Sequence, residues 1–209
     1  MHEETINYLK SYHSKYFHNS IVLDLGCSTT EFLISLLRAF PQIRNVIGID
    51  DDRDGKIKEF FNVELNDFEK QYSNIVNLNT WINTNEIDTS RIEFFNIGIE
   101  KYLESINKVD VICLLNVLHF YSNIDERDKL LKSIVQNIKI KGILFCRVAS
   151  DKHPYKDDDS KIVYTEKTLN SELEKYSLEL QHKIQVDGSN IFGVWKLKPK
   201  FRVEIEILQ

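Results

Sequence analysis

Two short apolar runs, each ending in a polar turn, constrain the fold of this chain more than any other feature. Residues 21–32 read IVLDLGCSTTEF, a buried-strand pattern that stops at Gly26 and passes into a helical pattern with Ser28 or Thr29 as candidate N-cap. Residues 46–52 read VIGIDDD, a second buried-strand pattern that ends in carboxylates. Strand, glycine turn, helix, strand and acid, in that order, are typical of α/β sheets that bind a nucleoside at the carboxyl ends of their strands.

The same alternation continues along the chain. Apolar strand patterns recur at residues 91–97, 109–115 and 143–149, and apolar stripes at helical spacing run over residues 32–40 and 130–138. Apolar strands that alternate with helices favour a parallel sheet covered on both faces. We therefore expect an α/β fold in three layers, with a doubly wound, mostly parallel sheet of seven strands.

The C-terminal part has a different pattern. A polar loop at residues 150–161 precedes a predicted helix at 165–176. Two strand-like runs, 178–186 and 191–197, are joined by Asp-Gly-Ser-Asn, which predicts an antiparallel hairpin. An alternating run at 201–207 is a candidate edge strand.

Length and spacing predict one domain. The chain has 209 residues, enough for one well-buried domain and too few for two. We expect residues 1–20 to form an amphipathic N-terminal helix that serves as a lid, and residues 21–209 to form a single domain with an insertion near 63–88.

Composition narrows the class of protein. A net charge of −5 argues against a protein held on nucleic acid by its overall field, although a local basic face stays open. The three cysteines lie in or beside apolar runs without metal or disulfide spacing, which indicates a reduced, cytoplasmic protein. No signal-peptide core and no run of eighteen apolar residues is present, so no membrane segment is expected. The histidines show no metal-ligand spacing, and no metal is expected.

The strand ends together resemble the class I S-adenosylmethionine-dependent methyltransferase family. The resemblance covers roughly residues 20–197 and rests on four strings: LDLGC at 23–27, GID at 48–50, DVICLLNVLH at 110–119 and KGIL at 141–144, the expected turn into the fifth strand. It implies a Rossmann-like fold of the class I methyltransferase type. The expected activity is in-line transfer of a methyl group from S-adenosylmethionine to a small-molecule acceptor.

The resemblance also assigns cofactor contacts. Gly26 would let the backbone pass close to the ligand, Asp24 would hold the ammonium group of the amino-acid part, and Asp50 would bond both ribose hydroxyls. Amides at the start of the following helix would face its carboxylate. The predicted cofactor-binding residues are Asp24, Gly26, Cys27, Asp50, Asp51, Asn96, Ile97, Gly98 and Asn116.

The acceptor side has weaker signals. His119 follows the fourth strand and is a candidate catalytic base or, equally, a packed structural histidine. The predicted acceptor contacts are Tyr16, Tyr121, His153 and Tyr155. A monomer or a homodimer is expected.

Departures from the family pattern keep alternatives open. Ile99 stands where the family usually has an acid for the adenine amino group, so Asn96, Glu100 or a backbone group would have to replace it. One alternative is an RNA or protein methyltransferase, and another is a non-catalytic cofactor-binding member of the family. A nicotinamide-dependent oxidoreductase fits less well, because Ser28 and Glu31 stand where its fingerprint needs glycines.

Overall fold

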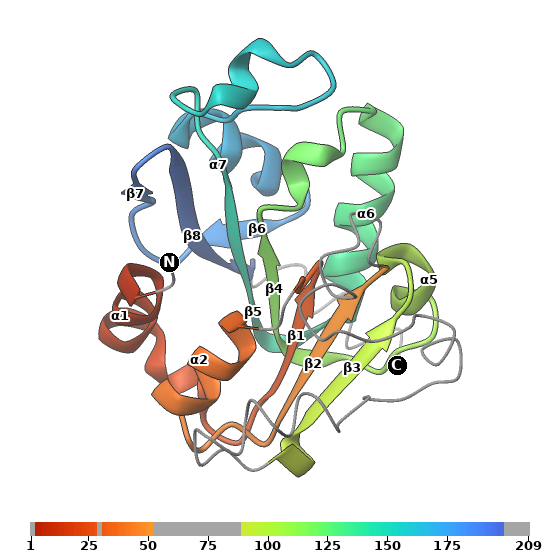
Figure 1. Ribbon diagram of the computed structural model, residues 1–209, viewed down its shortest axis with the longest axis vertical. Coiled ribbons are helices and arrows are strands. Elements are labelled where there is room, and N and C mark those ends of the chain that lie inside the picture. The colour runs from red at the N-terminus through yellow and green to blue at the C-terminus, as the bar shows by residue number, and fades with distance from the viewer. Residues whose placement is uncertain (1–2, 29–30, 52–88, 199–209) are drawn as a thin grey trace. The chain divides into compact units, whose positions relative to one another are not determined.

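The computed structural model describes residues 3–28, 31–51 and 89–198 (Figure 1). These residues fall into two compact units, the first ending at Ser105 and the second beginning at Ile106. The expected insertion near 63–88 and the run at 201–207 lie outside the described residues. The division into a lid at 1–20 and one domain from residue 21 stays a prediction.

The first unit is built on three parallel strands. β1 (Ile21–Leu25) pairs with β2 (Asn45–Asp50), and β2 pairs with β3 (Ile92–Asn96). Figure 1 shows these strands side by side, and α2 (Glu31–Ala39) and α5 (Ile99–Leu103) pack against β2. The other elements of this unit are α1 (Glu3–His13), η1 (Ser14–Phe17) and η3 (Thr89–Arg91).

Apolar spacing explains the core of this unit. α2 buries the stripe predicted from the sequence, and Phe17 stacks on Phe40 with ring centroids 4.4 Å apart. α1 buries Ile6, Tyr8 and Leu9. Burial of such a side chain contributes about 1.5–3 kcal/mol, which is why the strand ends are held in fixed positions.

The second unit combines a parallel pair with the predicted antiparallel hairpin. β4 (Val109–Leu115) is parallel to β5 (Ile138–Ala149), and β5 is antiparallel to β8 (Asn190–Leu197). β6 (Leu178–Leu180) and β7 (Gln185–Asp187) both pair with β8, so the run at 178–186 forms two short strands. The other elements of this unit are η4 (Leu118–Phe120), α6 (Ile124–Asn137), η5 (Pro154–Asp157) and α7 (Glu166–Glu174).

The fold class is therefore the expected one, parallel strands flanked by helices with a C-terminal antiparallel hairpin, and eight strands lie within the described residues. The start of β5 is a correction. Lys141 and Gly142 do not form the turn into this strand, which begins at Ile138. A Cβ on Gly142 would lie 2.5 Å from the carbonyl oxygen of Asp110, so the glycine allows a close backbone approach where the pairing with β4 is irregular.

Candidate functional site

In the first unit, the turn after β1 folds back over the end of β2. Gly26 has a φ of 75°, and the amides of Gly26 and Cys27 both donate to the carbonyl oxygen of Ile49, at 2.7 and 3.0 Å. The Cys27 side chain then fills the space over Gly48, where a Cβ would lie 2.7 Å from Sγ. The glycine in the second strand therefore allows this turn to pack.

Two carboxylates lie beneath this turn. Asp24 is only 1% exposed, and within the described part of the chain its Oδ1 has no hydrogen-bond partner. The backbone amide of Ser28, at a φ of 47°, donates to Asp50 Oδ2 at 2.9 Å. Burial, and then the charge of Asp50, raise the pKa of Asp24 to about 8. Burial, and then the charges of Asp24 and Asp50, raise the pKa of the Cys27 thiol well above its usual range.

The end of β3 completes this group of strand ends. Asn96 lies opposite Asp50, and the amide of Ile97 donates to the carbonyl oxygen of Asp50 at 3.0 Å. Gly98 is the N-cap of α5, and a Cβ on it would lie 3.9 Å from Glu100 Oε2. The Glu100 carboxylate therefore reaches back toward the end of β3, beside the position where Ile99 lacks an acid.

Two further residues predicted to line the site, Asp51 and Tyr16, also lie in the first unit. Asp51 is half-buried directly after β2, and its predicted contact with the cofactor stays a prediction. Tyr16 belongs to a group of rings on α1 and η1, where it stacks on His13 at 6.2 Å and lies under Lys15 Nζ at 5.1 Å. Thr29 and Thr30 lie outside the described residues, so the amides expected at the start of α2 are described only from Glu31 onward.

In the second unit, Asn116 directly follows β4 and has a left-handed backbone conformation. Its φ is 58°, and its amide donates to the carbonyl oxygen of Arg147 at 2.8 Å. Its side-chain Oδ1 is buried without a hydrogen-bond partner among the described residues. A non-glycine residue in this region of φ is uncommon and often marks a functional turn.

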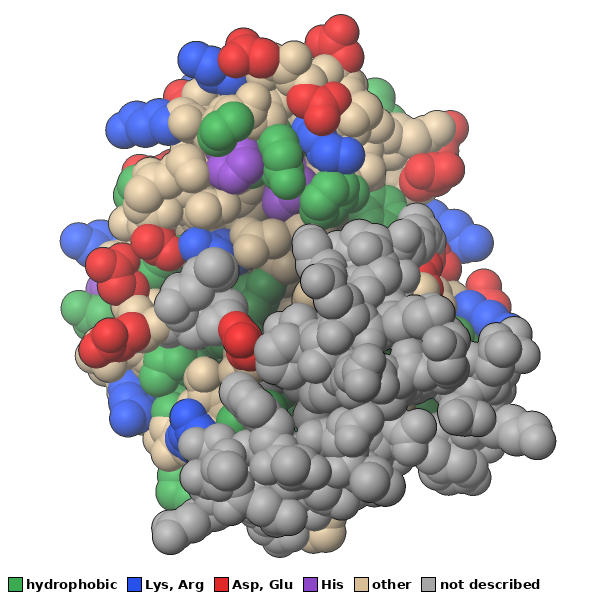
Figure 2. All heavy atoms as spheres, in the orientation of Figure 1, with side chains coloured by type: hydrophobic (Ala, Val, Ile, Leu, Met, Phe, Trp, Pro, Cys, Tyr) green, Lys and Arg blue, Asp and Glu red, His purple; other side chains and the backbone are tan. Residues whose placement is uncertain are grey.

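Three predicted residues of this unit do come together. The ring of His119 lies 5.1 Å from that of Tyr155, and His153 lies 4.2 Å from the same tyrosine. Two residues that the sequence analysis missed complete the group: Phe120, 4.3 Å from His119, and Lys161, whose Nζ lies 4.4 Å from the Phe120 ring centroid. We call these five residues the donor cluster. Figure 2 shows His side chains among hydrophobic ones on one face of the molecule.

Hydrogen bonds from the backbone determine which nitrogen of each imidazole acts as the acceptor. The amide of Ala149 donates to His119 Nδ1 at 3.4 Å, and the amide of Tyr155 donates to His153 Nδ1 at 3.2 Å. A neutral ring that accepts at Nδ1 carries its proton on Nε2. Burial, then the charges of His153 and Lys161, lower the pKa of His119 to about 4, so this ring is neutral at physiological pH.

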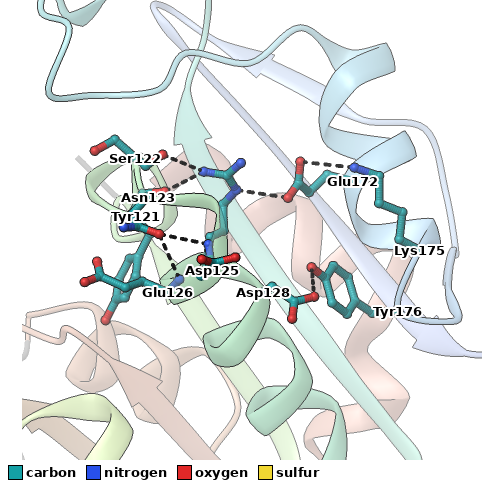
Figure 3. A network of polar contacts seen from close by, with 10 residues as sticks. Tyr121, Ser122, Asn123, Asp125, Glu126, Asp128, Glu172, Lys175 and Tyr176 are labelled. Carbon is teal, nitrogen blue, oxygen red and sulfur yellow. Dashed lines mark hydrogen bonds and ion pairs between the residues drawn. The ribbon is translucent and has the colours of Figure 1, made fainter.

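Tyr121 is held in a separate network (Figure 3). Arg127 Nη1 donates to the carbonyl oxygen of Tyr121 at 2.6 Å, and its Nε donates to Glu172 Oε1 at 3.0 Å. Asn123 caps α6 by accepting from the amides of Asp125 and Glu126. The loop that carries Tyr121 is thus fixed between α6 and α7.

The predicted site residues therefore fall into two groups, one in each unit. The strand-end residues gather in the first unit, and the donor cluster forms in the second. The sequence offers little to identify the two missed residues. Phe120 lies between the predicted residues His119 and Tyr121, and Lys161 is a single cation that closely follows three aspartates.

Several other kinds of site find no support in the described residues. Among them, no group of three or more His, Cys, Asp and Glu side chains could hold a metal ion. The three cysteines are buried and form no disulfide bond with one another. In the part of the chain that the structure describes, no helix combines the length and the apolar character needed to cross a bilayer.

Comparison with known proteins gives a match in structure but not in sequence. No family model and no curated protein sequence matches the chain. An O-methyltransferase family protein from Burkholderia thailandensis superposes with a TM-score of 0.65 at 13% identity, over 94% of this chain and 56% of that protein. The N-methyltransferase NodS from Bradyrhizobium japonicum, crystallised with S-adenosylhomocysteine, gives 0.63 at 14% identity, over 93% of this chain and 86% of NodS.

A third structure agrees with these two. The 1,6-didemethyltoxoflavin-N1-methyltransferase from Burkholderia thailandensis, with its substrate and S-adenosylhomocysteine bound, gives a TM-score of 0.63 at 13% identity, over 94% of this chain and 80% of the enzyme. The chain thus has the Rossmann-like fold of class I methyltransferases. It spans little more than half of the Burkholderia O-methyltransferase family protein.

Proposed function

We propose that the chain is an S-adenosylmethionine-dependent methyltransferase that acts on a small-molecule acceptor. One observation carries the proposal: a buried carboxylate, Asp24, has an unpartnered oxygen beside a second carboxylate, Asp50, at the strand ends of a methyltransferase fold. A buried carboxylate without a partner costs several kcal/mol, so a ligand with a cationic group would relieve it.

The residues present fit such a cofactor. Asp24 would accept from the ammonium of the amino-acid part, and Asp50, oriented by the Ser28 amide, would accept from the ribose hydroxyls. We propose that Glu100 takes the role of the acid that Ile99 lacks, because its carboxylate reaches the end of β3. Gly26 and Cys27 would line the turn, and Asp51, Asn96, Ile97 and Gly98 would surround the nucleoside.

The cofactor would supply an electrophilic methyl group, and the protein's task would be to orient an acceptor and exclude water. Asn116 offers a buried, unpartnered amide oxygen for that purpose. His119 remains the candidate catalytic residue, and we propose that it donates a hydrogen bond from Nε2, because Nδ1 already accepts from Ala149. Tyr16, Tyr121, His153 and Tyr155 remain candidate acceptor contacts.

Thermal-shift and calorimetric titrations with S-adenosylmethionine, S-adenosylhomocysteine and NADH test the proposal. Both sulfur nucleosides should stabilise the protein and NADH should not. Asp50→Ala should weaken S-adenosylhomocysteine binding about 10- to 100-fold, the loss expected for charge-assisted hydrogen bonds. Asp125→Ala, which removes an exposed acid from the start of α6, is the control and should bind normally. Stabilisation by NADH alone would contradict the proposal.

Ile99 supports a second candidate, a family member that binds the cofactor without catalysis. In that case S-adenosylhomocysteine would bind tightly. In a broad screen of small-molecule acceptors, however, no S-adenosylhomocysteine would be formed from S-adenosylmethionine. Turnover with any acceptor would exclude this candidate.

A further inference from the structure

The donor cluster is built as one unit from three segments of the chain. Besides the ring contacts, the amide of Ile162 donates to the carbonyl oxygen of His119 at 2.9 Å, which holds the segment with Lys161 against η4. The rings of Phe120 and Tyr155 lie 6.1 Å apart in an edge-on arrangement, and Phe120 is 50% exposed. Aromatic faces with an exposed edge are typical walls for a planar ligand.

Three polar groups of the cluster are donors, and the fourth, the Tyr155 hydroxyl, can donate or accept. With Nδ1 of His119 and of His153 engaged by backbone amides, the remaining ring nitrogen of each carries a proton. Lys161 adds an ammonium group, which has donors and no acceptor. An arrangement of three donors suits a ligand that brings acceptors.

The charge around the cluster points the same way. Among the described residues, no carboxylate is hydrogen-bonded or ion-paired to the side chains of His119, His153 or Lys161. The hydroxyl and the amide of Ser160 donate to the exposed Asp158 carboxylate at 2.6 and 2.9 Å and lower its pKa, and the charge of Lys161 lowers it further. Lys161 therefore has no ion-pair partner among the described residues.

We infer that the donor cluster binds the carboxylate of a small aromatic acceptor, with its ring against Phe120 and Tyr155; this rests on the function proposed above. The carboxylate accepts from Nε2 of His119 and His153 and is attracted by Lys161. A neutral amide of the same shape lacks the charge, and such charge-assisted bonds are roughly twice as strong as neutral ones.

Titration of the full chain with benzoate and with its neutral analogue benzamide, followed by NMR, tests the inference. Benzoate should bind about tenfold more tightly than benzamide. Lys161→Gln should weaken benzoate binding about fivefold and leave benzamide unchanged. Lys167→Gln, on exposed α7 surface, removes the same charge elsewhere and should change neither.

His153→Phe provides a second test, since it keeps a ring next to Tyr155 and removes one donor. It should also reduce the preference for benzoate. Equal affinity for the two probes, or an unchanged preference in both Lys161→Gln and His153→Phe, would overturn the inference.

S-adenosylhomocysteine binding, measured on the same samples, separates the two proposals. Retained nucleoside binding without a benzoate preference would overturn the inference alone. A benzoate preference without nucleoside binding would overturn the proposed methyltransferase and leave the carboxylate site.

Discussion

Two buried charged side chains, one in each unit, have opposite surroundings. Arg147 in the second unit is 6% exposed, and its Nη2 donates to Asp187 Oδ2 at 2.7 Å. Asp24 in the first unit is 1% exposed, yet its Oδ1 has no partner among the described residues, and the charge that most affects it is the like charge of Asp50. The charge of Arg147 is compensated within the protein, whereas the ionised form of Asp24 would not be.

This difference indicates a structural role for Arg147 and a ligand-binding role for Asp24. The ion pair Arg147–Asp187 joins β5 to the C-terminal hairpin and compensates the charge of Arg147, although Nε of Arg147 is buried without a hydrogen-bond partner among the described residues. An acid buried beside another acid destabilises the folded chain unless it is protonated or a cation arrives. We therefore expect substitutions at the two places to change stability in opposite directions.

The largest effect is expected from breaking the compensated pair. Asp187→Ala leaves Arg147 buried without its partner and should lower the free energy of unfolding by roughly 3 kcal/mol. The low end of the usual range applies because the Asp187 side chain is 24% exposed. Urea unfolding measures the change, and adding Arg147→Met should restore most of it. A loss below about 0.5 kcal/mol would mean that the pair does not stabilise the hairpin.

Removing the ionisable group of Asp24 should have the opposite effect and raise the free energy of unfolding at about pH 8. Because the pKa of Asp24 is raised to about 8, this group's contribution to stability is fully present below its unfolded pKa and is lost as the pH rises toward about 8. The loss is roughly 1.4 kcal/mol per pH unit, or about 2 kcal/mol between about pH 6.5 and about pH 8. Asp24→Asn should remove this slope, and should therefore be more stable than the wild type at about pH 8.

The pH range of that experiment matters. The pKa of His119 is lowered to about 4, so its contribution to stability rises with pH between about 4 and about 6.5 and opposes that of Asp24. Above about pH 6.5 the His119 contribution no longer changes with pH, so measurements in that range report the Asp24 contribution without it. An Asp24→Asn protein that is less stable than the wild type throughout would contradict the comparison.

A smaller loss of stability is expected from disturbing the packing of Cys27 against Gly48, in the turn above Asp24. Gly48→Ala places a Cβ 2.7 Å from Cys27 Sγ and should cost about 1–2 kcal/mol in unfolding free energy. Cys27→Ala in the same chain removes that sulfur, so the double variant should lose less than the sum of the single losses. Strict additivity in a thermal-melt cycle would show that the two residues do not pack as described.

How far the sequence predicts this molecule depends on the range of the interactions. β1 and β4 have the predicted bounds, because each is a run of apolar residues, interrupted by a single aspartate, that ends at a polar turn. The early start of β5 was missed, because Ile138 continues the helical stripe and only its pairing with Val109 makes it a strand residue. Local pattern cannot resolve such a boundary.

The site shows the same limit. The positions of Asp24, one residue before the end of β1, and of Asp50, at the end of β2, were predictable from the apolar residues around them, and their roles at a cofactor stay predictions. The donor role of His119 depends on the amide of Ala149, thirty residues further along, and the pairing of Arg147 with Asp187 spans forty residues. These contacts follow from the sheet register, which a single sequence does not specify.

Proton release on ligand binding tests the central claim most directly. Calorimetric titration of S-adenosylhomocysteine at about pH 7, in two buffers of different ionisation enthalpy, counts the protons exchanged. If Asp24 is protonated in the free protein and ionises against the ligand's ammonium, between roughly half a proton and one proton should leave per ligand bound. Asp24→Asn, and adenosine with the wild type, should release none. The same count for wild type and Asp24→Asn would contradict the account.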